Sequence, residues 1–111
     1  MQKISVGEFL SAVRFNADGL VPVIAQQFDS GEVLMMAWMN EDALNETIRT
    51  KRMCYFSRSR QQLWRKGKTS GHTQKLIDLR IDCDGDTLLA QIDQTGAACH
   101  TNNRSCFYRS L

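Results

Sequence analysis

The chain has 111 residues and a net charge of +2, and 42% of its residues are hydrophobic and 23% charged. This composition is typical of a globular protein rather than a disordered one, and the length suits one domain, residues 1–111, with a single core. The N-terminus lacks the apolar run of a secretory signal, and no stretch approaches the length of a transmembrane helix. We therefore expect a cytoplasmic protein, in which cysteines more often bind metals or act in catalysis than form disulfides.

Capping and turn residues predict two short helices and three strands in the first half of the chain. Ser5 and Glu8 form a capping-box pattern, which predicts a helix that ends near Phe15. Asn40 is a suitable N-cap for a second helix over residues 41–51. Apolar runs bounded by turn residues predict strands over residues 22–28, 33–39 and 53–57.

The second half of the chain is predicted to consist of strands and loops. Apolar residues between positions 76 and 81 predict a strand that ends near Cys83, and Asp84-Gly85 is a favourable hairpin turn into a strand over residues 87–93. A last short strand is expected over residues 106–109. These elements predict an α+β to mainly-β fold, in which antiparallel strands form a rolled sheet or pseudobarrel accompanied by two short helices.

Positive charge is concentrated in residues 57–75, which contain six basic and no acidic side chains. Such a segment suits phosphate, either on a small nucleotide or on a nucleic acid. Trp64 lies among these cations and can stack on a base, or it can serve as an ordinary core residue. The loop 69–73 resembles a binding turn. The residues expected to contact a substrate are Arg58, Arg60, Trp64, Arg65, Lys66, Ser70 and His72.

Three cysteines in the C-terminal third are candidate zinc ligands. Cys83, Cys99 and Cys106 would supply three thiolates, the number of protein ligands that a catalytic zinc usually keeps. The alternative is a set of buried free thiols, which Cys54 in its apolar strand fits well, so we leave Cys54 out of the site. His100 lies beside a proposed ligand, and it is either a general acid/base or a fourth zinc ligand.

Three aspartates surround the first of these cysteines. Asp82, Asp84 and Asp86 are hard ligands that favour magnesium or related ions, whereas thiolates favour zinc. The pattern is not a complete EF-hand loop, because its twelfth position is Asp93 rather than glutamate. If the segment is extended, the aspartates point to one side and Cys83 to the other, where it could meet Cys99 and Cys106 of a second subunit. The alternative is a solvated acidic hairpin tip.

Eight short motifs follow one another along the chain: Gly19–Pro22, Gly31–Met35, Ser57–Arg60, Leu63–Gly67, Thr69–His72, Asp82–Asp86, Ala98–Thr101 and Ser105–Tyr108. In this order they resemble the phosphoribosyl-AMP cyclohydrolase family, and the resemblance runs from about residue 15 to the C-terminus. Asn102-Asn103 stands where many members carry glycine, and asparagine tolerates the same left-handed backbone.

The resemblance implies the third step of histidine biosynthesis. Water opens the adenine ring of N1-(5-phosphoribosyl)-AMP between N1 and C6 and yields a formimino-aminoimidazole carboxamide ribonucleotide. The resemblance also implies a homodimer with one zinc per subunit, bound by Cys83 of one subunit and by Cys99 and Cys106 of the other. Magnesium would lie on Asp82, Asp84 and Asp86. No nucleic-acid or membrane partner is expected.

The expected chemistry is hydrolysis by zinc-activated water with His100 as acid/base, while the cations of residues 58–66 hold the two 5′-phosphates. Two rival functions are less suitable. A nucleobase deaminase requires H-x-E and P-C-x-x-C motifs, which are absent from the sequence. A nucleic-acid-binding module would leave the three aspartates unexplained, because they repel a phosphate backbone.

Overall fold

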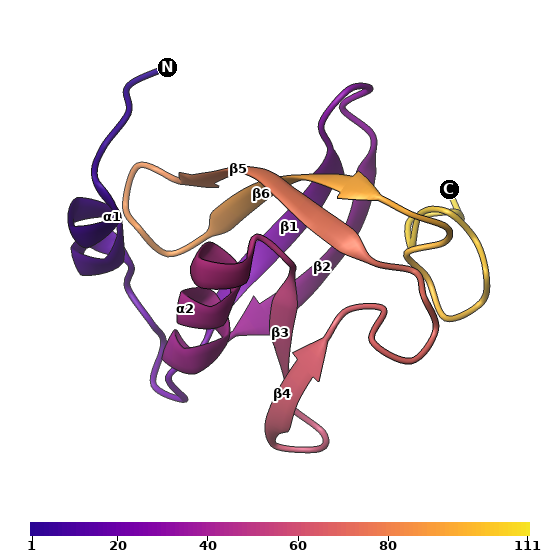
Figure 1. Cartoon of the computed structure of the whole chain (residues 1–111), viewed down its shortest axis with the longest axis horizontal. Helices are drawn as coiled ribbons and strands as arrows, with labels where there is room; N and C mark the ends of the chain where they lie inside the picture. Colours follow the sequence, from indigo (N-terminus) through magenta and orange to yellow (C-terminus); the bar gives the residue numbers. More distant parts are fainter.

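Six strands form two separate sheets in the computed structural model, which describes residues 1–111 (Figure 1). The larger sheet has four strands in the order β2-β1-β6-β5, and the smaller sheet is the hairpin β3-β4. The predicted α+β class is confirmed, but the sheets do not close into a barrel. The elements are α1 (Val6–Ala12), β1 (Val21–Gln27), β2 (Val33–Met39), α2 (Glu41–Thr50), β3 (Cys54–Ser57), β4 (Gln62–Arg65), β5 (Gln74–Ile81) and β6 (Leu88–Gln94).

The two central strands of the larger sheet, β1 and β6, run parallel. The outer pairs β1-β2 and β5-β6 are antiparallel hairpins, so the sheet is mixed and the expectation of antiparallel strands alone is wrong. Parallel strands cannot be joined by a tight turn, and here the connection between them contains β2, α2, the whole β3-β4 hairpin and β5. No local sequence signal announces such a pairing.

The core lies on one face of this sheet. Buried residues alternate with half-buried ones along β1, and with half-buried or exposed ones along β6, as the two-residue period of a strand requires. Helix α2 packs on β2 and β3 and contributes Ala43 and Leu44 to the core. Tyr55 of β3 is completely buried within the same cluster of 18 residues.

Both predicted helix caps are confirmed. The Ser5 hydroxyl accepts from the Glu8 amide at 3.1 Å, and the Asn40 side chain accepts from the Ala43 amide at 2.8 Å. The first helix nevertheless ends at Ala12, before the expected Phe15. The reason is tertiary, because the Arg14 amide donates to the carbonyl of Gly85 in the β5-β6 turn instead of continuing the helix.

One expected strand is absent, and one observed strand was not expected. Residues 106–109 form no strand, and the Cys106 amide makes a single bond of 2.7 Å to the Leu34 carbonyl of β2. Conversely, β4 was not expected, because its residues belong to the cationic segment and lack an apolar pattern. It forms because Trp64 pairs with Tyr55 across the hairpin, where the two ring centroids lie 5.5 Å apart. Neither helix has the length and apolar character that crossing a bilayer requires.

Candidate functional site

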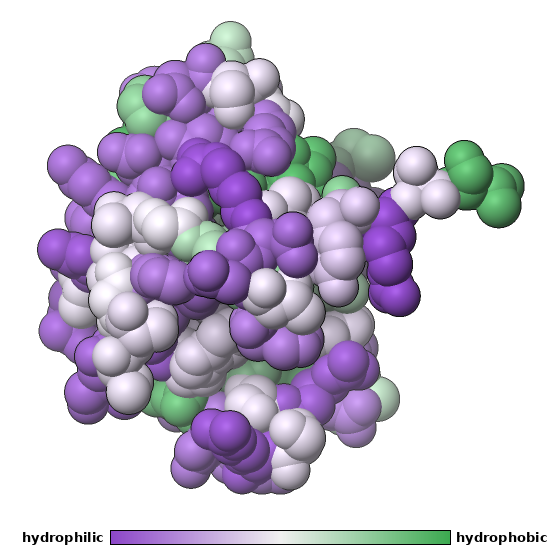
Figure 2. Space-filling view, turned by 90° about the vertical axis from the view of Figure 1, so that its right-hand side faces the viewer, coloured by the Kyte–Doolittle hydropathy of each residue, from purple (hydrophilic) through white to green (hydrophobic).

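A cavity of about 890 Å³ opens where the loop after β4 meets the segment after β6. This is the right-hand side of Figure 1, which faces the viewer in Figure 2 and carries a mostly hydrophilic surface. Strand β2 closes the cavity with Met35, Met36 and Ala37. Nine of the residues expected at the site line it: Arg60, Trp64, Arg65, Lys66, Ser70, His72, Cys99, His100 and Cys106.

Two thiols, those of Cys99 and Cys106, lie next to each other in the lining of the cavity. Backbone bonds from Ala98 to Arg104 and from Cys99 to Asn103 close the loop that carries Cys99, and Cys106 is tied to β2. The Thr101 hydroxyl lies 2.9 Å from the Cys99 sulfur, and hydrogen bonding from Thr101 lowers the pKa of the Cys99 thiol. Burial, followed by the adjacent Cys99, raises the pKa of Cys106 to about 11. Both thiols are free, and a pair of free, adjacent thiols matches the ligands that zinc prefers.

Lys66 connects these thiols to the aromatic part of the cavity. Its ammonium group lies 5.8 Å from the centre of the Trp64 ring. Desolvation lowers the pKa of Lys66, while the neighbouring thiols of Cys106 and Cys99 oppose that shift. The lysine is half-buried, so its charge acts within the cavity rather than in bulk solvent.

Two glycines determine where His72 lies. Gly67 has φ of +81°, and a Cβ atom there would lie 2.6 Å from the backbone of His72. The ring of His72 rests against Gly96, where a Cβ atom would lie 2.6 Å from the imidazole Cδ2. Ser70 adds a bond of 3.2 Å from the His72 amide to its hydroxyl. The binding turn expected from the sequence is therefore a compact loop that presents His72 to the cavity.

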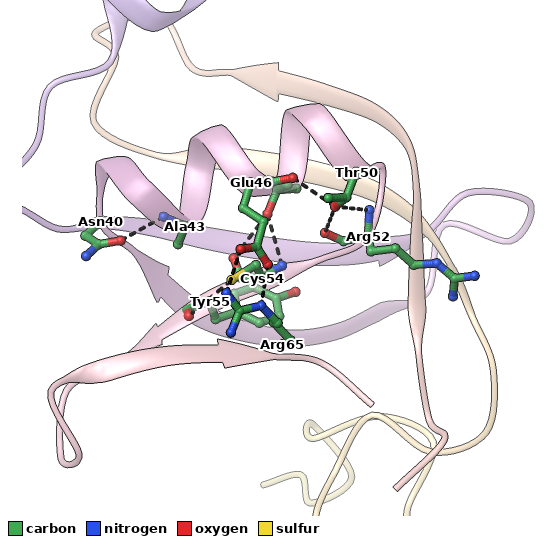
Figure 3. A network of polar contacts seen from close by, with 9 residues as sticks. Asn40, Ala43, Glu46, Thr50, Arg52, Cys54, Tyr55 and Arg65 are labelled. Carbon is green, nitrogen blue, oxygen red and sulfur yellow. Dashed lines mark hydrogen bonds and ion pairs between the residues drawn. The ribbon is translucent and has the colours of Figure 1, made fainter. Parts of the chain in front are cut away.

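Arg65 lines the cavity but is already engaged by helix α2. Its Nε and one terminal nitrogen donate to the two carboxylate oxygens of Glu46 at 2.7 and 2.8 Å (Figure 3). This fork lowers the pKa of Glu46 and orients the guanidinium group. Cys54 lies beneath this pair, and burial, together with the charge of Glu46, raises its pKa to about 11. Cys54 is a buried thiol outside the cavity, as expected.

Arg58 is the one expected substrate contact that does not line the cavity. Its guanidinium lies 4.8 Å above the ring of Trp38 in β2.

The three aspartates form a separate cluster on the β5-β6 turn. Their carboxylate oxygens lie within 4.8 Å of one another, and all three residues are exposed. The segment is a tight turn at Gly85, where φ is +80°, so the alternation expected for an extended segment does not apply. Desolvation raises the pKa of Asp82, but hydrogen bonds from Asp86 and Thr87 outweigh it and lower the pKa, whereas Asp82 and Asp84 raise that of Asp86.

Cys83 shares this turn and cannot reach the other two cysteines of its own chain. The turn precedes β6, and the loop with Cys99 follows it, so the seven residues of the strand separate them (Figure 1). A strand of that length spans roughly 20 Å, whereas a zinc–sulfur bond is about 2.3 Å long. Cys83 is exposed on its turn.

Sequence reasoning missed part of the cavity lining. Lys68 and Thr69 belong to the acid-free basic segment, so the charge pattern could have included Lys68. Met36 is 46% exposed in the middle of an apolar strand, and only the structure shows that this exposed face lines the cavity. Asn102 also lines it and adopts φ of +69°, the left-handed geometry expected at that position.

Fold and site together define a small α+β protein with a cationic cavity that is also lined by two thiols and two histidines. The family model of phosphoribosyl-AMP cyclohydrolase matches residues 35–108. Curated proteins of that name are similar to most of the chain. The one from Alkalilimnicola ehrlichii is 68% identical over 92% of this chain and 72% of its own length. The one from Rhodospirillum rubrum is 68% identical over 91% of this chain and 71% of its own length. The one from Granulibacter bethesdensis is 61% identical over 96% of this chain and 83% of its own length.

The chain therefore belongs to the phosphoribosyl-AMP cyclohydrolase family. It is an enzyme, and the family name describes a hydrolase of histidine biosynthesis.

Proposed function

We propose that this enzyme adds water to C6 of the adenine ring of N1-(5-phosphoribosyl)-AMP and breaks the N1–C6 bond. The observation that carries the proposal is one cavity of about 890 Å³ that gathers cations, an aromatic ring, two histidines and two thiols. The cations suit the two 5′-phosphates of this substrate, and the Trp64 ring suits its base. Alkylation at N1 makes C6 electron-poor, but neutral water is a weak nucleophile, so the reaction needs activation of water.

Zinc is the proposed activator, held by Cys99 and Cys106 of one subunit and Cys83 of a second. The adjacent free thiols support the first part, and the distance of Cys83 from them within one chain supports the second. The proposal therefore includes a homodimer with one zinc per subunit. When bound, zinc lowers the pKa of a coordinated water from about 15.7 towards about 7.

His100 is the proposed acid/base. It lines the cavity one residue after Cys99, so it lies beside the proposed metal position. The imidazole accepts one proton from the attacking water and returns it to the N1 side as the N1–C6 bond breaks, while the second proton of that water moves from the C6 hydroxyl to the exocyclic nitrogen as the carboxamide forms. The alternative is that His100 is a fourth zinc ligand. A His100 variant should then lose zinc, whereas it should keep zinc if His100 is only the acid/base.

Substrate binding is proposed for the side chains that line the cavity. Trp64 and Lys66 lie together at the base-binding part, and Ser70 and His72 lie on the compact loop. Three arginines add positive charge. Arg60 is an exposed residue of the lining, and Arg65 is a lining residue whose guanidinium group Glu46 orients. Arg58 lies just outside the lining, above the ring of Trp38.

Magnesium is proposed at Asp82, Asp84 and Asp86, whose oxygens are close enough to share a cation. The four free cysteines suit a cytoplasmic location, which is also part of the proposal.

An absorbance assay of adenine ring opening tests the proposal directly. We expect turnover of N1-(5-phosphoribosyl)-AMP by the metal-loaded protein, loss of turnover with a chelator, and recovery when zinc is added back. Turnover that persists after all zinc has been removed and verified by metal analysis would show that the metal role is wrong. Absence of turnover by the fully loaded protein would show that the reaction itself is wrong.

Mixing two inactive variants tests the shared zinc site. Cys83→Ala and Cys99→Ala proteins each lack one ligand, but a mixed dimer contains one intact site. We expect mixing to restore part of the activity. No recovery, despite demonstrated subunit exchange, would place the complete site within one chain.

A further inference from the structure

A second hollow, of about 410 Å³, lies beside the cavity, between the C-terminal end of α2 and the loop after β4. Its lining is strongly basic and has a single hydrophobic residue, Met53. Arg49 and Arg52 enter it from the end of α2, and neither has an assigned role. The other cations that line it are Arg65, Lys66 and Lys68.

The positive charge of this hollow is largely uncompensated. Glu46 is its only acidic residue, and both of its carboxylate oxygens are engaged by Arg65. The molecule has three ion pairs, and none of them involves Arg49, Arg52 or Lys68. Figure 3 shows the Arg52 side chain extending away from the end of the helix, on the side opposite to Asn40. Several cations around one concave site form an environment that favours a multiply charged anion.

The hollow adjoins the cavity. Arg65, Lys66 and Lys68 line both, so the chain segment 65–68 is their common wall. A ligand in the cavity and a charged group in the hollow would therefore face the same three cations.

The substrate class of the proposed reaction has such an end. It carries two 5′-phosphates on opposite sides of one adenine ring, so its two charged groups cannot occupy the same place. We propose that the hollow binds one of these phosphates and that Arg49 and Arg52 are its ligands. This inference rests on the proposed function for the identity of the substrate, and it adds a specificity site that lies away from the thiols.

Arginine suits this role for a geometric reason. A guanidinium group presents parallel N–H donors that match two phosphate oxygens, and its charge persists at any pH at which the protein is folded. Met53 is the one hydrophobic residue in the lining of the hollow, and the residues around it are predominantly cationic.

The test compares the double variant Arg49→Gln/Arg52→Gln with the parent in steady-state ring opening. We expect KM for N1-(5-phosphoribosyl)-AMP to rise roughly 10-fold or more, since two charge-assisted bonds are lost, while kcat changes less than about threefold. The increase of KM with salt should become shallower. The charge-keeping variant Arg49→Lys/Arg52→Lys should recover the salt dependence and part of the affinity.

A matched control removes two positive charges elsewhere. Lys3 and Arg80 lie near the N-terminus and on β5, and neither lines the cavity or the hollow. The double variant Lys3→Gln/Arg80→Gln should keep the parental KM. If both double variants raise KM equally, the effect comes from net charge and the assignment of the hollow is wrong.

Inorganic phosphate distinguishes a substrate subsite from a site for a free anion. As a competitive inhibitor it should lose affinity in Arg49→Gln/Arg52→Gln in parallel with the rise in KM. A loss of phosphate inhibition with an unchanged KM would overturn the substrate subsite and leave a separate anion site. An unchanged KM and unchanged inhibition would overturn any phosphate site in the hollow.

If the parent does not open the adenine ring, the proposed function fails separately. The hollow is then judged by ³¹P NMR titration of the parent and the double variant with ribose 5-phosphate. Binding by the parent that is lost in Arg49→Gln/Arg52→Gln supports a phosphate site, and equal titrations refute it.

Discussion

Replacing Tyr55 with phenylalanine tests the polar network beneath the cavity. Tyr55 is fully buried, and its hydroxyl donates to the side-chain oxygen of Gln74 at 2.6 Å. Burial holds the pKa of Tyr55 well above its usual range, so the hydroxyl stays protonated and remains a donor. The Gln74 amide nitrogen is engaged with Gln94 and Met35, which leaves the tyrosine as the only partner of the Gln74 oxygen.

The magnitude follows from the burial of that oxygen. Tyr55→Phe keeps the ring and the packing but leaves a buried acceptor without a partner, which costs about 1–3 kcal/mol of unfolding free energy. For a chain of 111 residues, the average unfolding entropy per residue converts this into a fall in Tm of about 4–13 °C. Turnover at a temperature where the variant is folded should change little, because the hydroxyl does not line the cavity.

Urea unfolding followed by tryptophan fluorescence measures the effect. Parent and variant are compared at the same protein and metal concentrations, since binding and association shift apparent stability. The expected result is a lower midpoint with an unchanged slope. Tyr108→Phe is the matched control, because Tyr108 is 48% exposed and loses only a solvated hydroxyl. If Tyr55→Phe unfolds within error of both the parent and Tyr108→Phe, the buried bond contributes nothing and the reasoning is refuted.

Three further predictions concern the site. Cys99→Ala should lose zinc and turnover together. The control Cys54→Ala, which removes a buried thiol outside the cavity, should keep its zinc. Metal analysis that finds full zinc in Cys99→Ala would show that Cys99 is not a zinc ligand. His100→Ala should keep zinc and lose turnover by roughly 100-fold or more, as expected for an acid/base, and loss of zinc instead would identify His100 as a ligand. Glu46→Gln should lower the urea midpoint at neutral pH, because Arg65 lowers the pKa of Glu46 in the folded state. The stability that the Glu46 carboxylate contributes is present above its unfolded-state pKa and disappears as the pH falls through its folded-state pKa. The difference in midpoint between parent and variant should therefore close in acid. A gap that stays constant with pH would show that the Glu46 charge is not its cause.

The starts of both helices and two of the three hairpins followed local signals closely. The Ser5 and Asn40 caps, the turn after β1 and the Asp84-Gly85 turn each depend on residues within a few positions of one another, so the sequence alone predicts them. The end of α1 could not be predicted in this way, because a carbonyl more than 70 residues away takes the amide that would have extended the helix.

The candidate site shows the same difference between features set by local sequence and features set by long-range contacts. The sequence identified most of the cavity through residue chemistry, since a basic segment, an aromatic ring and the Cys99-His100 pair have recognisable reactivity. It did not show that Arg65 is bound to Glu46 or that Arg58 stacks on Trp38 outside the lining, because these contacts join segments from different elements.

Residue type and short-range spacing determined which groups this chain offers: thiols, carboxylates and cations suited to metals and phosphate. Only the tertiary structure decided their grouping, since the parallel pairing of β1 and β6 and the length of β6 place Cys83 at one end of the sheet and Cys99 at the other. The reason is physical. Ligand chemistry is a property of single side chains, whereas distance between remote residues is set by how strands pair across the core.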